Sequence, residues 1–298
     1  MTDLTFDGKV AIITGAGGGL GKSHALELAR RGARIVVNDL GGSVDGTGDS
    51  ASAAQLVVDE ITAAGGEAVA DHNSVATAEG GAAIVRSAVD AFGTVDILIN
   101  NAGILRDKTF HNMTPDMVKP VLDVHLLGAF NVTQPAWLIM RDKNYGRIVN
   151  TSSNSGLLGN FGQANYGAAK LGLVGFTRVL ANEGRKRNIK VNAIAPVART
   201  RMTEDLLGPL GDKLDPSQVT PTVVYLAHED VPVSGEVYST AGGVVARYFI
   251  GLTEGWVKDG HSAEDVRDNF EQIRDEDGYI VPDDPSGELG KLLKLLTS

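Results

Sequence analysis

The 298-residue chain contains no cysteine. Disulfide bonds, thiolate nucleophiles and Cys-ligated zinc or iron–sulfur centres are therefore excluded, and we predict no metal site. Positive charge is also scarce, because 27 Lys and Arg face 37 Asp and Glu, which gives a formal net charge of −10. Nucleic-acid-binding proteins normally carry a basic face. We therefore expect no nucleic-acid partner.

Long hydrophobic runs are missing as well. No stretch reaches the roughly 18 apolar residues that a membrane-spanning helix needs. Residues 1–9 contain acidic side chains and no apolar segment, unlike a signal peptide. We therefore expect a cytoplasmic protein that does not bind membranes. With 43% hydrophobic and 21% charged residues, the composition is that of a globular protein with an extensive core.

Short β-branched runs alternate with helical patterns along most of the chain. Runs that are apolar on both faces and joined by helices indicate a parallel sheet that is covered on both sides. The predicted fold class is therefore α/β, a doubly wound parallel sheet of the Rossmann type. Helices are expected at 23–30, 51–64 and 84–92 and before each of the last two strands. Strands are expected at 9–14, 34–38, 67–70, 95–99, 147–150 and 190–194.

Two stretches are additions to this core. Residues 41–52 (GGSVDGTGDSAS) predict a surface loop, which is either a flexible connector or part of the adenosine end of a cofactor site. The second stretch is the C-terminal end. We divide the chain into a domain, 1–245, and a C-terminal extension, 246–298, that packs on the domain or on a neighbouring subunit. In the extension, Ser262 and Asp265 have the spacing of a capping box at the start of a helix.

The end of the extension carries an amphipathic stripe. Leucines at helical spacing alternate with lysines, a pattern that can pack on protein or touch a membrane surface. Packing on the protein or on a neighbouring subunit is the interpretation that we favour. The leucines are Leu289, Leu292, Leu293 and Leu296.

A glycine-rich turn, Thr14-Gly-Ala-Gly-Gly-Gly-Leu-Gly21, lies between the first strand and the first helix. A diphosphate can bind there at the helix N-terminus, although any tight strand-to-helix turn favours glycine. Asp39 ends the second strand, where a carboxylate bonds the hydroxyls of an adenosine ribose and repels a 2′-phosphate. This pattern favours NAD over NADP. The alternative is an aspartate in a solvated turn.

A second constellation is Tyr166-Gly-Ala-Ala-Lys170, with Ser153 upstream. On a helix, positions i and i+4 share a face, so the lysine ammonium is expected near the phenol. A tyrosine pKa is about 10, and a nearby cation lowers it. Such a tyrosine can take a hydroxyl proton, while Ser153 supplies a hydrogen bond to the reacting oxygen. By itself this spacing is also common on ordinary helix surfaces.

These motifs, together with Asn100-Asn-Ala-Gly103, resemble in their order and spacing the short-chain dehydrogenase/reductase family over residues 6–245. Longer stretches resemble more closely the (3R)-hydroxyacyl-CoA dehydrogenase unit of the peroxisomal multifunctional β-oxidation enzyme and its bacterial stand-alone relatives. These stretches are 36–42, 100–107 and 159–166.

The resemblance implies a role for each motif. Tyr166 is the acid/base, Lys170 lowers its pKa and binds the nicotinamide ribose, and Ser153 orients the substrate oxygen. Tyr166 and Lys170 also count among the cofactor contacts. The other residues that would bind NAD are Gly15, Gly19, Leu20, Gly21, Asp39, Leu40, Ser74, Val75, Asn101, Ala102, Gly103, Pro196, Ala198 and Thr200.

Three positions depart from the family pattern. His125, a predicted catalytic residue, stands where most members have an asparagine that positions a proton-relay water; a helix-packing histidine is the alternative. Asn73 stands where many members place an aspartate that faces the adenine. Val197 follows Pro196 where a glycine is usual, so the cofactor contacts of that loop are less well defined.

The implied reaction is reversible hydride transfer between NAD and a secondary alcohol, with the 3-hydroxyl of a (3R)-hydroxyacyl-CoA as the favoured substrate. A hydroxysteroid, an acyl-carrier-protein thioester and a non-catalytic NAD-binding sensor are the alternatives. The family also implies a homotetramer or homodimer. Candidates for binding the phosphates of CoA are Arg106, Lys108, Arg199 and Arg201, although exposed basic residues near a loop are commonly just solvated.

Overall fold

A computed structural model of the chain describes residues 3–43, 45–47, 52–199 and 213–297. The chain divides into two compact units, Met1–Arg247 and Tyr248–Ser298. The first unit contains the central sheet and the residues predicted to form the site.

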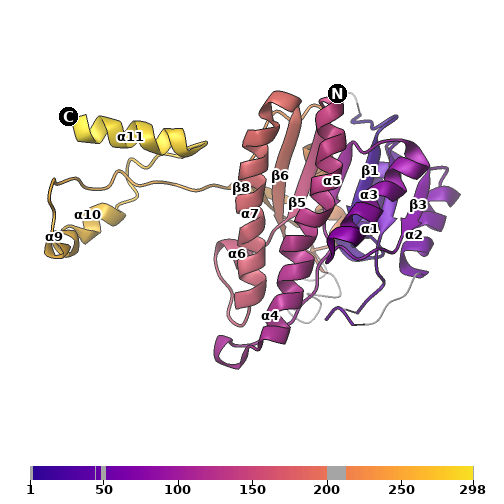
Figure 1. The fold of residues 1–298 in the computed structure, drawn as a ribbon, viewed down its shortest axis with the longest axis horizontal. Helices are drawn as coiled ribbons and strands as arrows, with labels where there is room; N and C mark the ends of the chain where they lie inside the picture. Colours follow the sequence, from indigo (N-terminus) through magenta and orange to yellow (C-terminus); the bar gives the residue numbers. More distant parts are fainter. Residues whose placement is uncertain (1–2, 44, 48–51, 200–212, 298) are drawn as a thin grey trace. The chain divides into compact units, whose positions relative to one another are not determined.

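The described residues form a sheet of eight strands in the order β3-β2-β1-β4-β5-β6-β7-β8 (Figure 1). All neighbouring pairs from β3 to β7 are parallel. The order reverses between β1 and β4, and ligands bind at such a switch point in doubly wound sheets. The strands are β1 (Val10–Thr14), β2 (Arg34–Asn38), β3 (Ala68–Asp71), β4 (Ile97–Asn100), β5 (Gly146–Thr151), β6 (Ile189–Pro196), β7 (Val237–Ala241) and β8 (Val244–Tyr248).

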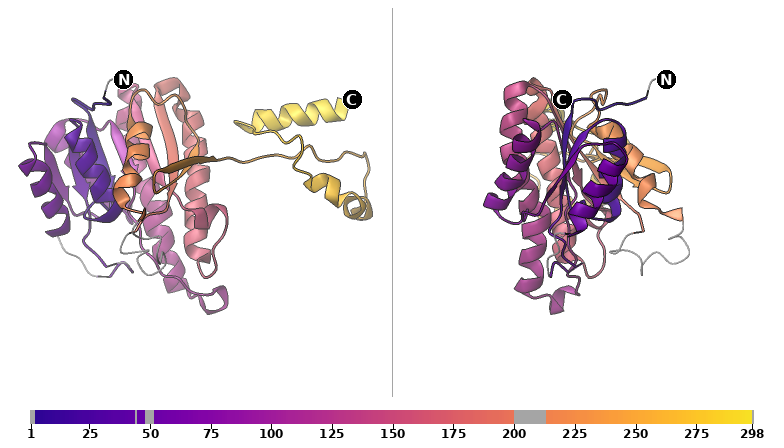
Figure 2. Two further views of the ribbon diagram at one scale, coloured as in Figure 1. Left: turned by 180° about the vertical axis from the view of Figure 1, so that it is seen from behind. Right: turned by 90° about the vertical axis from the view of Figure 1, so that its right-hand side faces the viewer.

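Helices cover both faces of the sheet. Figure 1 shows α3, α5 and α7 side by side on one face, and Figure 2 shows the first helix and α8 on the other. The helices of this unit are α1 (Gly19–Arg30), α2 (Ser52–Ala63), α3 (Ala78–Phe92), α4 (Pro115–Leu122), α5 (Gly128–Lys143), α6 (Asn154–Leu157), α7 (Ala164–Gly184) and α8 (Thr220–Ala227). A π-helical turn, Asp123–Leu127, joins α4 to α5.

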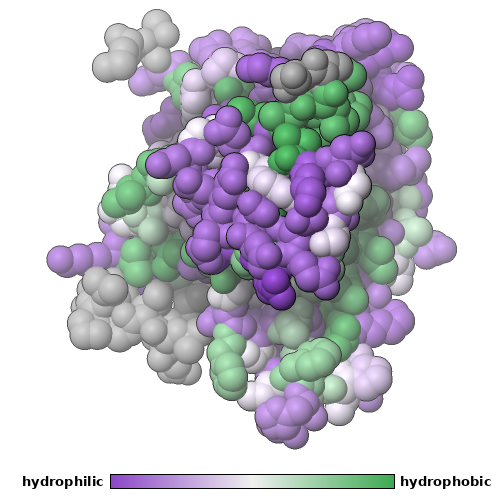
Figure 3. Space-filling view, turned by 90° about the vertical axis from the view of Figure 1, so that its left-hand side faces the viewer, coloured by the Kyte–Doolittle hydropathy of each residue, from purple (hydrophilic) through white to green (hydrophobic). Residues whose placement is uncertain are grey.

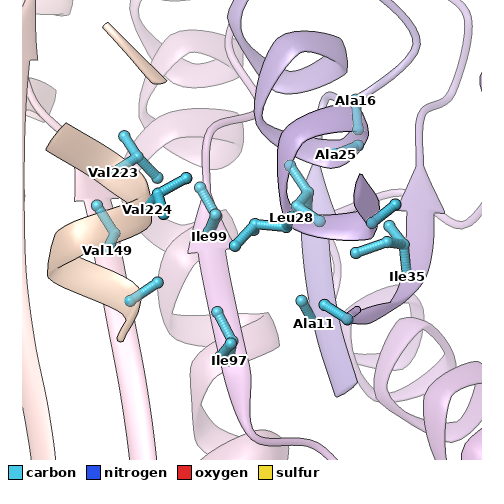
Figure 4. Packing of buried hydrophobic residues seen from close by; sticks show 14 of the residues in the cluster. Ala11, Ala16, Ala25, Leu28, Ile35, Ile97, Ile99, Val149, Val223 and Val224 are labelled. Atoms are coloured by element: carbon cyan, nitrogen blue, oxygen red, sulfur yellow. The ribbon is translucent and has the colours of Figure 1, made fainter. Parts of the chain in front are cut away.

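Apolar side chains on both sides of the sheet form the core. On the α1 side, Leu28 packs with Ile99 of β4 and with Val223 and Val224 of α8 (Figure 4). On the other side, α3 and α5 contribute a second cluster that includes Ile84. The strands are buried on both faces because each face has its own helical layer. The α/β doubly wound class predicted from the sequence is confirmed.

Most of the predicted helices and strands lie within a few residues of the observed ones. The helix expected at 84–92 begins earlier, at Ala78, because the side chain of Thr77 caps it by accepting a hydrogen bond from Gly80 N. The strands β7 and β8 were not predicted from the sequence. Gly242 and Gly243, both with positive φ, join these two strands in a two-residue turn.

The C-terminal unit contains α9 (Ala263–Asp268), α10 (Phe270–Arg274) and α11 (Pro285–Thr297). The predicted capping box is present, since Ser262 Oγ accepts from Asp265 N and Asp265 accepts from Ser262 N. None of the described side chains of this unit is fully buried, and hydrophobic residues lie beside hydrophilic ones at its surface (Figure 3). No helix among the described residues combines the length and apolar character needed to span a membrane.

Candidate active site

One large cavity of about 580 Å³ opens among the loops that follow β1, β2, β4 and β5. It extends from Asp39, at the end of β2, to Tyr166 on α7, and most of the predicted site residues line it. Those that do are Gly15, Gly19, Leu20, Asp39, Leu40, Ser74, Val75, Asn101, Ala102, Gly103, His125, Ser153, Tyr166, Lys170, Pro196 and Ala198.

The glycine turn supplies the part of the cavity nearest the N-terminus of α1. Gly15 has φ of +64°, and a Cβ there would lie 2.7 Å from Ala102 Cα, so a side chain would clash with the loop after β4. Gly18 caps α1 without any side-chain hydrogen bond. The first N–H groups of the helix are therefore open to a ligand, and their partial positive charge fits a diphosphate.

Gly21 was expected to contact the cofactor, but the structure does not place it in the lining of this cavity. It is buried against the loop after β4. A Cβ at Gly21 would lie 2.3 Å from Gly15 O and 2.6 Å from Asn101 Nδ2. The observed contacts of Gly21 are packing contacts: the absence of a side chain lets α1 approach the turn and the amide of Asn101.

The side chain of Asn101 holds two loops together. Its Nδ2 donates to Thr14 O and Gly15 O, both at 3.0 Å. Thr14 Oγ1 in turn accepts from the backbone N–H groups of Asn101 and Ala102. These bonds fix the turn after β1 against the segment after β4, so both sides of the cavity are preformed.

Asp39 lies at the adenosine end that the sequence predicts. Its Oδ2 accepts from Gly17 N at 2.7 Å and its Oδ1 accepts from Gly41 N at 2.6 Å. These bonds hold the carboxylate at the end of β2, and each oxygen keeps further lone pairs for ligand hydroxyls. The position fits the ribose of a dinucleotide. The negative charge disfavours a phosphate there.

Ser153, Tyr166 and Lys170 meet at the other end of the cavity. Ser153 follows β5 and caps α6, where its Oγ accepts from Ser155 N at 3.1 Å. Tyr166 and Lys170 lie one turn apart on α7, with Lys170 Nζ 5.4 Å from the centre of the Tyr166 ring. The ammonium donates to Thr151 O at 2.5 Å. The predicted shared helical face therefore exists, and it is turned into the cavity.

The pKa values of these two groups are set mainly by burial. Burial raises the pKa of Tyr166 to about 12, although hydrogen bonding to Ser153 lowers it and the charge of Asp107 raises it further. Burial also lowers the pKa of Lys170 to about 7. The sequence predicted a lowered tyrosine pKa; in the structure the pKa is raised, because burial removes the hydration that would stabilise the phenolate.

His125 belongs to the π-helical turn and is 3% exposed. Its Nε2 lies 2.8 Å from Ile104 O and 3.0 Å from Ile104 N, so in either tautomer the ring bonds to the backbone of Ile104 in the loop after β4. Nδ1 is buried, and the described residues offer it no hydrogen-bond partner. Burial, and then the charge of Lys170, hold the pKa of His125 well below its usual value. The ring is therefore neutral at physiological pH.

Comparison of the sequence with known protein families identifies the family of this chain. A family model described as short chain dehydrogenase matches residues 9–207. The chain belongs to the short-chain dehydrogenase family. The resemblance found in the sequence is thus confirmed.

Related proteins cover nearly the whole of this short-chain dehydrogenase. The peroxisomal multifunctional enzyme A of Dictyostelium discoideum is 47% identical over 99% of this chain, which spans 66% of that protein. A short-chain type dehydrogenase/reductase of Mycobacterium tuberculosis is 50% identical over 92% of this chain and 96% of its own length. The peroxisomal hydratase-dehydrogenase-epimerase of Saccharomyces cerevisiae is 54% identical, and this chain spans 27% of it.

Solved structures show the same fold. The full-length peroxisomal multifunctional enzyme type 2 of Drosophila melanogaster matches with a TM-score of 0.84 and 38% identity, over 99% of this chain and 50% of that one. A short chain dehydrogenase of Mycobacterium avium matches with a TM-score of 0.80 and 42% identity, over 91% and 96% of the two chains.

Of the four basic residues considered for CoA phosphates, Arg106 lines the cavity. Its guanidinium donates to the backbone oxygens of Asp45 and Asp116, so it ties two loops together. Lys108 is exposed, and so is Arg199. Arg201 and the predicted cofactor contact Thr200 lie outside the described residues.

Several lining residues were not predicted from the sequence. Gly42, Ser43 and Gly46 come from the segment expected to be a surface loop, which supports its contribution to the adenosine end. Asn160 and Gln163 come from the loop before α7. Gln163 donates to Asp107 at 2.6 Å. Only the folded chain brings these loops together. Their glycines and side-chain amides could have predicted turns at the ligand-binding edge of the sheet.

Proposed function

We propose that the protein is an NAD-dependent dehydrogenase that oxidises the 3-hydroxyl of a (3R)-hydroxyacyl-CoA to a 3-ketoacyl-CoA. The observation that carries the proposal is one cavity with a helix N-terminus and Asp39 at one end and Ser153, Tyr166 and Lys170 at the other. The helix end and the carboxylate fit a dinucleotide without a 2′-phosphate. When bound, NAD supplies the acceptor of a hydride.

Ser153, Tyr166 and Lys170 each have a different role in moving the proton of the substrate. The Tyr166 phenolate takes the proton of the substrate alcohol, and Ser153 holds the substrate oxygen by a hydrogen bond. Lys170 places a positive charge beside the phenol when it is protonated, which favours the phenolate. Because burial raises the pKa of Tyr166 to about 12, this help is needed near neutral pH.

His125 acts in this proposal as a positioning residue. Its bond to Ile104 fixes the loop after β4, and its ring packs against that of Tyr166. A neutral, buried imidazole with a strongly lowered pKa is a poor general acid. The geometry therefore supports orientation of Tyr166 and of the loop, in place of the catalytic role predicted for His125.

The names of the relatives support a 3-oxygenated acyl thioester as the substrate class. They include multifunctional and hydratase-dehydrogenase-epimerase enzymes of peroxisomes. The 3-oxoacyl-[acyl-carrier-protein] reductase of Synechocystis is 39% identical over 99% of its own length, which makes carrier-protein thioesters the second candidate. Asp39 argues for the CoA dehydrogenase, because its charge disfavours the 2′-phosphate of NADPH, the usual electron donor of reductive biosynthesis.

The test is NADH formation by the purified chain with NAD and either (3R)- or (3S)-3-hydroxyacyl-CoA at short and long chain lengths. We expect absorbance to rise only with the (3R) thioester. The proposed substrate would be wrong if neither CoA thioester were oxidised while the protein turned over a free hydroxysteroid, or 3-oxoacyl-carrier-protein with NADPH. NADH binding without turnover of any of these substrates would point to the non-catalytic sensor.

A further inference from the structure

The side-chain amide of Asn165 holds the start of α7 to two other segments. Asn165 precedes Tyr166 in the first turn of this helix and is 3% exposed. Its Nδ2 donates to Arg106 O at 2.9 Å, in the loop after β4, and to Met117 O at 2.8 Å, in α4. Its Oδ1 accepts from Tyr166 N at 2.7 Å. One buried side chain therefore joins α7, α4 and the loop after β4.

The first turn of α7 depends on this contact. The first N–H groups of a helix have no partner within the helix. The side chain of Gln163, the residue that precedes α7, makes no capping hydrogen bond. Asn165 Oδ1 satisfies the N–H of Tyr166 in place of a cap. The position of Tyr166 is therefore tied to that of the Asn165 amide, which α4 and the loop after β4 hold from the other end.

Apolar side chains from the same three segments pack beside this turn. Ile104 of the loop after β4, Val121 of α4 and Ala169 of α7 form a small buried cluster, and Tyr166 packs against it. Apolar burial is non-directional, whereas hydrogen bonds require defined distances and angles. The three bonds of Asn165 therefore supply the directional part of the contact between Tyr166 and its neighbours.

We propose that Asn165 is a positioning residue for the proton chemistry of Tyr166. It holds the first turn of α7 against α4 and the loop after β4, so that the phenol stays within reach of a substrate oxygen at Ser153. The inference rests on the proposed function, because it takes Tyr166 as the group that accepts the proton. Asn165 itself does not line the cavity, and it acts through the tyrosine.

Asn165→Asp is the test variant. The carboxylate keeps an acceptor for Tyr166 N, but it cannot donate to Arg106 O or Met117 O and adds a third acceptor beside them. We expect kcat with NAD and a (3R)-3-hydroxyacyl-CoA, counted per NADH-binding site, to fall roughly 10- to 100-fold, the cost of misplacing a reacting group by about 1 Å. The dissociation constant of NADH should change by less than about twofold, because the variant leaves the glycine turn and Asp39 as they are.

Asn182→Asp is the matched control. Asn182 is an exposed amide on the same helix, and its Oδ1 accepts from Arg185 Nη2 at 3.0 Å. This variant should keep the wild-type kcat per site. A merely structural role of Asn165 would lower the number of NADH-binding sites and leave the rate at each remaining site unchanged. That result for Asn165→Asp would overturn the inference.

Combination with Tyr166→Phe tests whether Asn165 acts through the tyrosine. If it does, Asn165→Asp should lower the small residual rate of Tyr166→Phe by less than about twofold, because no hydroxyl is left to position. Losses that multiply in the double variant would show that Asn165 acts independently of the hydroxyl and would refute the inference.

A second measurement decides the matter if Asn165→Asp does not fold. A crystal structure of the wild-type protein with NAD and a 3-ketoacyl-CoA should keep Asn165 Nδ2 on both carbonyls, with the Tyr166 hydroxyl within hydrogen-bond distance of the substrate oxygen. A tyrosine that reaches this oxygen while the amide has left both carbonyls would refute the inference. Wild-type protein that oxidises no alcohol would refute the proposed function. Wild-type turnover that Asn165→Asp fully retains would refute the positioning role alone and leave the function standing.

Discussion

The ring of His125 stands edge-on to the ring of Tyr166, with centroids 5.1 Å apart and planes at 88°. The edge-to-face arrangement is the favourable one for aromatic pairs. It packs the proposed acid/base against a neutral imidazole that is itself bonded to the backbone of Ile104. A Cβ at Gly103 would lie 2.3 Å from His125 Cε1. The π-helical turn, the loop after β4 and the tyrosine thus form one packed unit.

Tyr166→Phe should abolish most turnover and leave dinucleotide binding intact. The substitution removes the hydroxyl that exchanges a proton with substrate and keeps the ring that packs against His125. We expect kcat to fall by about 10² to 10⁴, the usual contribution of a general acid/base. The dissociation constant of NADH should stay within about twofold, since the substitution leaves the glycine turn and Asp39 at the other end of the cavity unchanged.

Tyr225→Phe is the control for this substitution, because Tyr225 is 43% exposed on α8 and does not line the cavity. It should keep both the rate and the affinity. Retention of most of the rate by Tyr166→Phe would contradict the assignment of Tyr166 as acid/base.

The burial of Lys170 should make stability depend on pH. Below pH 7 its ammonium is charged in both the folded and the unfolded chain, and burial of the charge costs stability. In the folded protein the pKa is about 7, against about 10.4 unfolded. Between these values the unfolded chain binds more protons, so stability rises with pH by at most about 1.4 kcal/mol per unit.

Lys170→Met removes this dependence. Urea unfolding at pH 6.5 and 9.5 should therefore show the wild-type protein gaining stability relative to Lys170→Met as the pH rises. Lys186→Met, at an exposed lysine, should parallel the wild type at both pH values. A constant difference between wild type and Lys170→Met would show that the buried ammonium keeps an ordinary pKa.

Asp39→Asn should relax the choice between NADH and NADPH. The substitution removes the charge that repels a 2′-phosphate, and it replaces one acceptor of the backbone bonds to Gly17 and Gly41 by a donor. We expect Asp39→Asn to bind NADH about tenfold more weakly than the wild type does, and to bind NADPH about as tightly as it binds NADH. Fluorescence titration measures both constants. Asp59→Asn, on the exposed side of α2, should leave the preference as it is, and an unchanged preference in Asp39→Asn would argue for a residue elsewhere.

Gly21→Ala should destabilise the fold, because its Cβ would press into Gly15 O and the Asn101 amide. Overpacking of this kind costs about 1 to 3 kcal/mol. Gly18→Ala is the matched control in the same turn, since no atom lies within 4 Å of a Cβ there. Chemical denaturation should show a large loss for the first variant and a small change for the second. Equal losses would mean that the turn, and not the packing, requires glycine.

Exposed apolar side chains on α5 and α7 predict a homodimer or a homotetramer. Phe130 stacks on Phe176 at 4.0 Å between ring centres and is still 46% exposed. Leu138 and Val179 are also more than half exposed on these helices. We expect light scattering to give two or four times the chain mass of 31.2 kDa, and Phe130→Arg to lower it. Leu56→Arg, on α2, should not lower it, and a wild-type mass of one chain would contradict the prediction.

The sequence by itself determined the features that depend on neighbours along the chain. The glycine turn after β1, the capping box at Ser262 and the shared face of Tyr166 and Lys170 follow from spacing, because strand, turn and helix geometry are local. The alternation of apolar strands and helices fixed the doubly wound class, since parallel strands need covered faces and crossover helices.

Only the tertiary structure decided what burial and distant contacts do to these residues. Gly21 carries the same glycine signal as Gly15, yet it packs against Asn101 while Gly15 lines the cavity. The tyrosine pKa rises because long-range packing removes water from Tyr166. The bonds from Asn165 to α4 and to the loop after β4 join segments that are far apart in the sequence. Hydration and contacts between distant segments arise only when the whole sheet and both helical layers are in place.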